Sequence, residues 1–238
     1  MSADLPGRQA GPVPAWELII FDNDGVLVDS EHLANTILGD LLTGYGVATT
    51  TDEAVERHLG TSLGDVRAAL EAGGVAVPSD FEATYHRRLF AAFASSLTPV
   101  AGVTAVLAGL TAPVCVASSG GHERIRRSLA RTGLLDRFEG RIFSAGDVDR
   151  GKPAPDLFLH AAAVMGARPA RCAVIEDSPL GVEAANAAGM TAFGYAAVTP
   201  TRRLGAASFV FSSMGELPRL LAAGPAGAGG RGGQGART

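Results

Sequence analysis

The amino-acid sequence predicts an α/β fold: a Rossmann-like open parallel sheet with helices on both faces, plus an inserted all-helical domain. Three observations predict it. Short apolar runs alternate with helical patterns along most of the chain, the apolar runs are continuous, and a long stretch after the first run lacks any strand pattern. A continuous apolar strand is typical of a parallel sheet, because helices then cover both of its faces.

Six apolar runs are the expected strands, at residues 18–21, 114–118, 141–145, 172–176, 191–195 and 208–211. Helical patterns separate most of them, over residues such as 121–131, 155–166 and 179–188. In open sheets of this kind, ligands bind at the carboxyl ends of the strands. We therefore expect the chemistry of this protein along that edge.

Residues 31–98 break the alternation, because they contain only helical patterns. We expect them to form a helical cap inserted into an α/β core of residues 15–30 and 99–222. Residues 98–102, with the sequence TPVAG, are expected to be the return hinge.

Both ends of the chain have the composition of flexible tails. Residues 1–14 are rich in proline and glycine, and residues 223–238 are glycine-rich and too simple in composition to bury a core. The second tail contains a G-x-G-x-x-G sequence at residues 227–232. Dinucleotide binding needs a strand before such a sequence and a helix after it, so we reject a nucleotide-binding module there.

Composition excludes several classes of protein. The chain has 238 residues, 47% of them apolar and 18% charged, and can bury a sizeable core. A net charge of −4 argues against a protein that coats nucleic acid. No apolar run approaches the roughly 20 residues that span a bilayer, so no membrane partner is expected. Arginines cluster at residues 85–90 and 122–131, and we interpret both clusters as solvated helix faces.

The two cysteines, Cys115 and Cys172, each lie in a short apolar run without a CxxC pattern. We expect two unpaired thiols in the core, which favours a reducing, cytoplasmic compartment. The first residues are interrupted by prolines and lack the apolar segment of a signal peptide. We therefore expect a soluble, cytoplasmic protein that acts as a monomer.

Polar side chains collect where four of the expected strands end, while the strands themselves carry almost none. A lone aspartate at a strand end is more often a helix cap than a catalytic residue. Four such ends at one edge of a sheet are hard to explain structurally. They carry Asp22, Asp24 and Gly25; Ser118, Ser119, Gly120 and Gly121; Lys152; and Glu176, Asp177 and Ser178.

These residue types together suit phosphoryl transfer. Clustered carboxylates stay ionised only beside a cation, and a few oxygen ligands favour Mg²⁺, which shares the phosphate oxygens of its substrate. Ser118 and the glycine-rich turn before a helix provide a hydroxyl and free N–H groups for an anion, and Lys152 adds a positive charge. A carboxylate nucleophile completes a site for transfer through an aspartyl-phosphate.

Four sequences, FDNDGVLVDSE, VCVASSG, GKPAPD and VIEDSPLGVEAANAAGM, resemble the four successive motifs of the haloacid dehalogenase superfamily, in the same order. The resemblance covers about residues 16–221. It is strongest to the β-phosphoglucomutase-like phosphatases, which carry a small helical cap just after the first motif. It implies Mg²⁺-dependent hydrolysis of a small phosphate ester through an aspartyl-phosphate.

The resemblance assigns roles to the four acids. Asp22 would be the nucleophile and a Mg²⁺ ligand, and Asp24 the general acid/base whose backbone carbonyl also binds the metal. Glu176 and Asp177 would complete the metal site, with Asp177 as the expected direct ligand. Haloacid dehalogenases resemble this pattern but lack a carboxylate at the position of Asp24, so its presence indicates a phosphate ester.

The resemblance also implies a phosphate site. Ser118 would bind the phosphoryl oxygens, together with the glycine-rich turn at Gly120 and the backbone N–H groups of Asn23, Asp24 and Ser119. Lys152 would stabilise the charge on the nucleophile. The side chain of Asn23 has no assigned role, because an apolar residue or cysteine is more usual between the two aspartates.

Three further residues of the first motif concern the cap. Gly25 would let the chain turn toward it. Asp29 lies where the chain leaves the core, so it is expected to be a hinge or helix-capping residue beside Ser30.

Two positions separate hydrolysis from the mutase reaction. Mutases of this subgroup resemble the chain but carry a histidine twelve residues after the nucleophile, where this sequence has Ala34. They also carry an arginine after the Gly-x-Ser of the cap, where this sequence has Leu63. His32 lies on the same early helix, and two interpretations of it stay open: a substitute for that histidine, or an exposed helix residue with no role in the reaction. We expect simple hydrolysis, and a hexose-phosphate mutase of the β-phosphoglucomutase type stands as the alternative.

Substrate choice is expected to come from the cap. Thr61 and Ser62 are the candidate substrate-binding residues there, with Arg57, His58 and Arg67 nearby. The sequences around the second and third motifs resemble sugar-phosphate and polyol-phosphate phosphatases, including 6-phosphogluconate phosphatases. A non-catalytic protein with the same fold is disfavoured, because no catalytic position is substituted.

Overall fold

The computed structural model describes residues 16–58 and 61–225, so the first expected tail, most of the second and its G-x-G-x-x-G sequence lie outside them. The described residues form one six-stranded sheet in the order β3-β2-β1-β4-β5-β6, with every neighbouring pair parallel. All six predicted strands are confirmed, with small differences at the ends of β3 and β6. The strands are β1 (Leu18–Phe21), β2 (Val114–Ser118), β3 (Ile142–Ser144), β4 (Cys172–Glu176), β5 (Thr191–Tyr195) and β6 (Phe209–Phe211).

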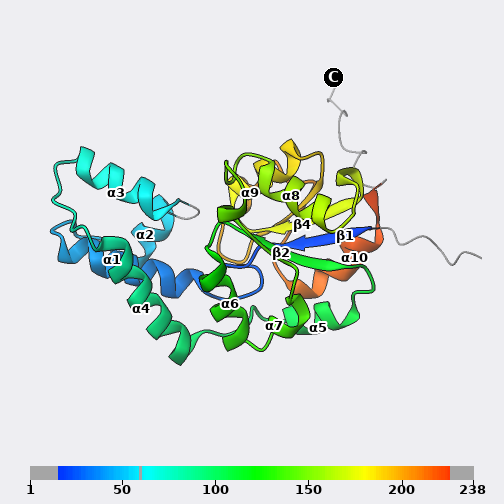
Figure 1. The fold of residues 1–238 in the computed structure, drawn as a ribbon, viewed down its shortest axis with the longest axis horizontal. Coiled ribbons are helices and arrows are strands. Elements are labelled where there is room, and N and C mark those ends of the chain that lie inside the picture. Colours follow the sequence, from blue (N-terminus) through cyan, green and yellow to red (C-terminus); the bar gives the residue numbers. More distant parts are fainter. Residues whose placement is uncertain (1–15, 59–60, 226–238) are drawn as a thin grey trace, which may run out of the picture.

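Helices cover both faces of the sheet (Figure 1). One face packs against α5 (Val103–Gly109), α6 (His122–Arg131), α7 (Leu135–Phe138) and α10 (Leu217–Ala222). The other face packs against α8 (Asp156–Val164) and α9 (Pro179–Ala187). In β1, Ile19 and Phe21 face the first group, while Leu18 and Ile20 face the second. Burial on both faces explains why the strands are continuous apolar runs.

The helical insertion follows β1 and contains α1 (Glu31–Gly44), α2 (Thr51–His58), α3 (Leu63–Ala72) and α4 (Phe81–Ser96). It lies beside the sheet, at the left of Figure 1. Its apolar residues, such as Leu42 and Leu89, belong to the same buried cluster as one face of the sheet. At the carboxyl end of α4, the carbonyl groups of Phe93 and Ala94 accept hydrogen bonds from Arg131 of α6, at 3.1 Å and 3.0 Å.

The two chain segments that join the insertion to the sheet run side by side. Val28 and Pro99 form an antiparallel bridge, and the backbone N–H of Asp29 donates to the carbonyl oxygen of Thr98 at 2.9 Å. Asp29 is exposed, so it takes part in this connection through its backbone. Ser30 precedes α1 but makes no capping hydrogen bond with its side chain.

Cys115 and Cys172 are both buried and unpaired, as predicted. They lie on β2 and β4, on the face of the sheet that packs against α8 and α9. Burial raises the pKa of Cys172 to about 11, so its thiol stays protonated at neutral pH. Among the described helices, none combines the length and the apolar character needed to cross a membrane.

Candidate active site

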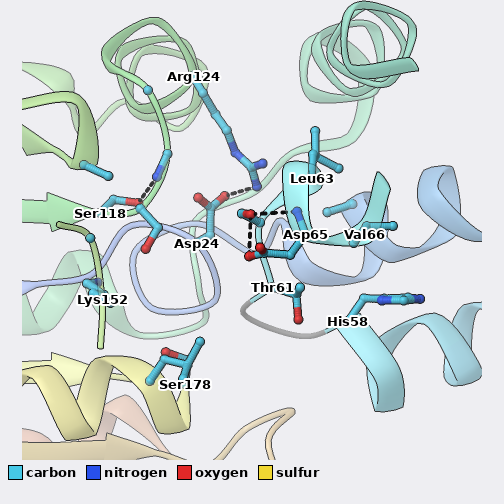
Figure 2. A pocket seen from close by; sticks show the side chains of 18 of the residues that line it. Asp24, His58, Thr61, Leu63, Asp65, Val66, Ser118, Arg124, Lys152 and Ser178 are labelled. Atoms are coloured by element: carbon cyan, nitrogen blue, oxygen red, sulfur yellow. Dashed lines mark hydrogen bonds and ion pairs between the residues drawn. The ribbon is translucent and has the colours of Figure 1, made fainter. Parts of the chain in front are cut away.

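A cavity of about 540 Å³ lies between the carboxyl edge of the sheet and the helical insertion. We call its lining residues at positions 22–24 and 118–180 the floor, and its lining residues at positions 31–86 the roof. Figure 2 shows Ser118, Lys152 and Ser178 of the floor facing His58, Thr61 and Asp65 of the roof. The residues that follow four separate strands therefore meet in one place, together with helix ends of the insertion.

Most of the residues predicted for the site line this cavity. They are Asp22, Asp24, Thr61, Ser62, Ser118, Ser119, Gly120, Lys152, Glu176 and Asp177. Asn23 is the exception, because its fully buried side chain points toward α6, where its amide donates to Ser128 Oγ at 3.1 Å. The side chain of Asn23 therefore ties the loop after β1 to α6, and only its backbone is left for a ligand.

Lys152 connects the two ends of the floor. It is the only lysine in the chain, and its side chain is 4% exposed. The ammonium group donates to Asp22 Oδ1 (2.7 Å), Glu176 Oε1 (2.5 Å) and the carbonyl of Ala117 (3.0 Å), which uses all three of its N–H bonds. Burial alone would lower the pKa of Lys152, but the two carboxylates outweigh it and hold the pKa above its usual range. Lys152 is therefore a fixed cation.

The floor holds more negative than positive charge. Burial, opposed by Lys152 but reinforced by Glu176 and Asp24, raises the pKa of Asp22 to about 7. Burial and the neighbouring acids Glu31, Glu176 and Asp22 raise the pKa of Asp177 well above its usual value. Such mutual repulsion between buried carboxylates is relieved by a bound cation.

Gly25 allows Asp177 to enter this cluster. It has a φ of +76°, and a Cβ at this position would lie 2.0 Å from Asp177 Oδ2. Any side chain here would therefore both strain the backbone and displace the carboxylate. The tight turn after the two aspartates of the first motif thus keeps Asp177 beside them.

The donor set fits Mg²⁺, although it does not enclose an ion by itself. Both oxygens of Glu176 accept hydrogen bonds, Oε1 from Lys152 and Oε2 from the backbone and hydroxyl of Ser178 at 2.9 Å each. This leaves Asp22 and Asp177 better placed than Glu176 to bind a metal. Within the part of the chain that the structure describes, no three acidic, histidine or cysteine side chains converge on one point. Mg²⁺ suits such a site, because it keeps several waters and shares phosphate oxygens.

Asp24 stands apart from the lysine and pairs with an arginine. Its Oδ1 accepts a hydrogen bond from Arg124 Nη2 at 2.8 Å (Figure 2) and another from Ser30 Oγ at 2.5 Å. Burial would raise the pKa of Asp24, but the Arg124 guanidinium and these hydrogen bonds outweigh it and hold the pKa below its usual value. The two aspartates of the first motif thus have different partners and opposite pKa shifts.

The sequence interpretation of the arginine cluster was wrong for Arg124. Arg126 and Arg127 are exposed as predicted, but the Arg124 side chain is 16% exposed and lines the cavity. Arg124 lies in the first turn of α6, beside buried Ile125 and at the helix end that faces the strand ends. That position is the signal that could have identified it.

Glu31 is a second residue that sequence reasoning missed. It begins α1, lines the cavity and accepts a hydrogen bond from Asn35 Nδ2 at 3.1 Å. Burial and the nearby charge of Asp24 raise the pKa of Glu31 to about 7. An acid in the first turn of a helix ordinarily interacts with the helix dipole, so nothing in the sequence pattern assigns Glu31 to the site.

The roof is more open than the floor. Thr61, Ser62 and Asp65 are exposed. Ser62 caps α3, where its Oγ accepts from the backbone N–H of Asp65 at 3.1 Å and donates to Asp65 Oδ2 at 2.7 Å. His58 also lines the cavity, whereas Arg57 forms a 3.5 Å ion pair with Glu53 on the surface of α2.

Comparison with known proteins agrees with the four motifs. The family model for haloacid dehalogenase-like hydrolases matches residues 16–189. The chain is 30% identical to 6-phosphogluconate phosphatase of Escherichia coli over 207 residues, which cover 86% of this chain and 94% of that protein. It is 28% identical to β-phosphoglucomutase of Bacillus subtilis, over 74% of this chain and 81% of that enzyme.

Solved structures show the same architecture. A haloacid dehalogenase-like protein of Agrobacterium tumefaciens superposes with a TM-score of 0.79 at 36% identity, covering 87% of this chain and 98% of that one. A hydrolase of the same family from Deinococcus radiodurans, which was solved with bound phosphate and sodium, has a TM-score of 0.72 at 31% identity, covering 91% and 98%. The chain is thus an enzyme of the haloacid dehalogenase-like hydrolase family, and it belongs with the phosphatases and β-phosphoglucomutases that it resembles.

Proposed function

We propose that the protein is a Mg²⁺-dependent phosphatase that hydrolyses a small sugar or polyol phosphate through an aspartyl-phosphate on Asp22. One observation carries the proposal: Asp22 is held by Lys152 at 2.7 Å, on the floor of a cavity where Asp24 has a separate partner. Among the relatives, 6-phosphogluconate phosphatase and fructose-1-phosphate phosphatase of Escherichia coli support a sugar phosphate as substrate.

In the proposed first step, a carboxylate oxygen of Asp22 attacks phosphorus, and the bond from phosphorus to the alcohol oxygen breaks. Asp24 is ionised beside Arg124 in this structure, so in this proposal it first takes up a proton from solvent as the substrate binds, and then gives that proton to the alcohol oxygen. Water then attacks the phosphorus of the aspartyl-phosphate and returns a proton to Asp24, releasing inorganic phosphate and regenerating Asp22. Proton transfer by Asp24 contributes roughly 10²–10⁴-fold to the rate.

The remaining floor residues serve the phosphoryl group in this proposal. Ser118 Oγ accepts from the backbone N–H of Gly120 at 3.2 Å, so its own hydroxyl proton is left to donate to a phosphoryl oxygen. The N-terminus of α6 and the N–H of Ser119 add further donors for an anion. Mg²⁺, held by Asp22 and Asp177 with the backbone carbonyl of Asp24, would supply positive charge to the phosphate oxygens.

Two roof positions favour hydrolysis over the mutase alternative. Ala34 and Leu63 both line the cavity, at the places where the resemblance to mutases calls for a histidine and an arginine. His32 is exposed on α1 and is not among the lining residues described. Among its described residues, the roof therefore lacks the histidine and the arginine that would hold a second phosphate for return to the sugar.

The proposal extends to the role of the insertion and to the setting of the enzyme. Residues 31–98 form the cap that closes over the substrate, and residues 15–30 with 99–222 form the catalytic core. The enzyme acts in the cytoplasm as a monomer. Its two unpaired, buried thiols favour a reducing compartment.

The test is Mg²⁺-dependent phosphate release from a panel of sugar, polyol and nucleotide monophosphates, using wild type, Asp22→Asn and Asp29→Asn. Asp22→Asn is expected to abolish turnover, because the amide cannot form the aspartyl-phosphate. Asp29→Asn is the matched control and should keep wild-type activity, since Asp29 is exposed outside the cavity. An Asp22→Asn enzyme with most of its activity would contradict the mechanism. Conversion of β-glucose 1-phosphate with a bisphosphate primer would instead support the mutase.

A further inference from the structure

The roof of the cavity carries carboxylates but, among its described lining residues, neither lysine nor arginine. Its acids are Glu31, Asp65 and Glu82, and the last two are exposed. Its two histidines are not cationic substitutes. Burial, reinforced by the nearby charges of arginines, holds the pKa of His58 and His86 below the usual value, so both imidazoles are neutral at pH 7.

The two cations of the floor are already engaged. Lys152 is bound to two carboxylates, and Arg124 donates to Asp24 at 2.8 Å from a side chain that is 16% exposed. Arg124 keeps a buried Nε without a hydrogen-bond partner, but its single positive charge is already balanced by Asp24, so a second anion there would lie beside that carboxylate without a cation of its own. The floor, once Mg²⁺ balances its remaining acids, provides for one anion, the phosphoryl group.

We infer that the leaving alcohol of the substrate carries no second anionic group, so the enzyme selects monophosphates of neutral or cationic polyhydroxy compounds. The inference rests on the proposed phosphatase function and narrows its substrate class. The roof suits hydroxyl groups, because carboxylate oxygens and the side chains of Thr61, Ser62 and Asn35 accept or donate hydrogen bonds. The same carboxylates repel a second phosphate or a sugar acid.

Matched substrate pairs test the inference. We compare kcat/KM for glucitol 6-phosphate with that for 6-phosphogluconate, which differ in the group at the far end of the chain, and fructose 1-phosphate with fructose 1,6-bisphosphate. We expect kcat/KM to be about tenfold or more higher for the member of each pair that lacks a second anionic group. This is the effect of one unfavourable charge contact near a protein surface. Equal or better hydrolysis of the anionic member of both pairs would overturn the inference.

A charge reversal in the roof tests whether its carboxylates cause the preference for substrates without a second anionic group. Glu82 lies on α4, is exposed and lines the cavity, so Glu82→Lys should raise the 6-phosphogluconate to glucitol 6-phosphate ratio about tenfold. Asp40→Lys is the matched control, because Asp40 is exposed on α1 of the same insertion but is not among the described lining residues. It makes the same change in net charge and should leave the ratio unchanged. A ratio that moves equally in both variants, or in neither, contradicts the inference.

para-Nitrophenyl phosphate separates the two levels of the proposal, because its leaving group is small and lacks a second anion. Hydrolysis of this ester together with indifference to charge in the matched pairs would sink the inference and leave the phosphatase standing. Failure to hydrolyse this ester and every member of the panel, with Mg²⁺ present, would overturn the proposed function and the inference with it. Hydrolysis with the expected preference supports both.

Discussion

The floor and the roof of the cavity face each other but are built in different ways. In the floor, the buried carboxylates of Asp22 and Glu176 are both bound to the buried ammonium group of Lys152. In the roof, Thr61, Ser62 and Asp65 are exposed. Charges in a buried cluster depend strongly on each partner, while exposed charges are screened by solvent. A substitution in the floor should therefore affect stability and turnover together. A substitution in the roof should change the choice of substrate and leave the fold intact.

Lys152→Met should have the largest effect. It keeps an unbranched side chain against the ring of Phe158 but leaves the buried carboxylates of Asp22 and Glu176 without their cation. Loss of one partner of a buried ion pair costs about 3–5 kcal/mol in the free energy of unfolding. Denaturant unfolding of the metal-free protein measures this cost.

Arg57→Met provides the comparison for Lys152→Met. The Arg57 side chain is 56% exposed in its ion pair with Glu53, and loss of such a pair costs at most about 1 kcal/mol. If both substitutions destabilised the protein equally, the floor would not be the coupled cluster that its geometry indicates.

A pair of glycine substitutions sharpens the contrast. Gly25→Ala, next to the floor, places an alanine at a backbone φ of +76° and pushes its methyl group into the Asp177 carboxylate. We therefore expect a loss of about 1–3 kcal/mol in unfolding free energy and a fall in turnover. Gly64 belongs to the roof and lies in α3. Gly64→Ala adds a methyl group that would be 3.7 Å from Ser62 Oγ, which is an ordinary van der Waals distance. It should leave stability unchanged or raise it by up to about 1 kcal/mol.

The same two measurements, denaturant unfolding and phosphate release, serve both glycine variants. Destabilisation by Gly64→Ala as large as that by Gly25→Ala would show that the roof is as tightly determined as the floor. A stable and active Gly25→Ala would mean that Asp177 does not need its place against the backbone of the first motif.

The same difference explains what could be predicted from the sequence. The floor follows from local rules, because continuous apolar runs identify buried strands and the polar residues after them must meet at one edge. Lys152 was found in this way, although it reaches Asp22 across 130 positions in the chain. Arg124 and Glu31 were missed because both lie in the first turn of a helix. A charged residue there is usually a solvated surface residue or one that interacts with the helix dipole. The orientation of a helix relative to the sheet decides whether that explanation holds, and it depends on packing between distant segments such as α4 and α6.

A solvent-exposed ion pair, Glu17 with Arg168, lies at the amino end of β1. It can be compared with the buried ion pair of Asp22 and Lys152 at the carboxyl end of the same strand. Glu17 accepts hydrogen bonds from the backbone N–H and the guanidinium Nε of Arg168, both at 3.0 Å, and the Arg168 side chain is 73% exposed. These hydrogen bonds and the charge of Arg168 lower the pKa of Glu17 to about 2. In the unfolded chain the pKa returns to its usual 4.5.

Glu17→Gln should therefore have the smallest effect, with a defined dependence on pH. Because the folded state binds the proton of Glu17 less tightly than the unfolded state, the pair stabilises the fold above pH 4.5, and this contribution disappears as the pH falls toward 2. Denaturant midpoints of wild type and variant should differ slightly at neutral pH and converge on acidification. The difference at neutral pH should be far below that for Lys152→Met, and salt should reduce it, because the pair is exposed. A difference that grows on acidification would show that Glu17 is held by something other than its charge. It would also remove the contrast between this solvated pair and the buried lysine at the other end of the strand.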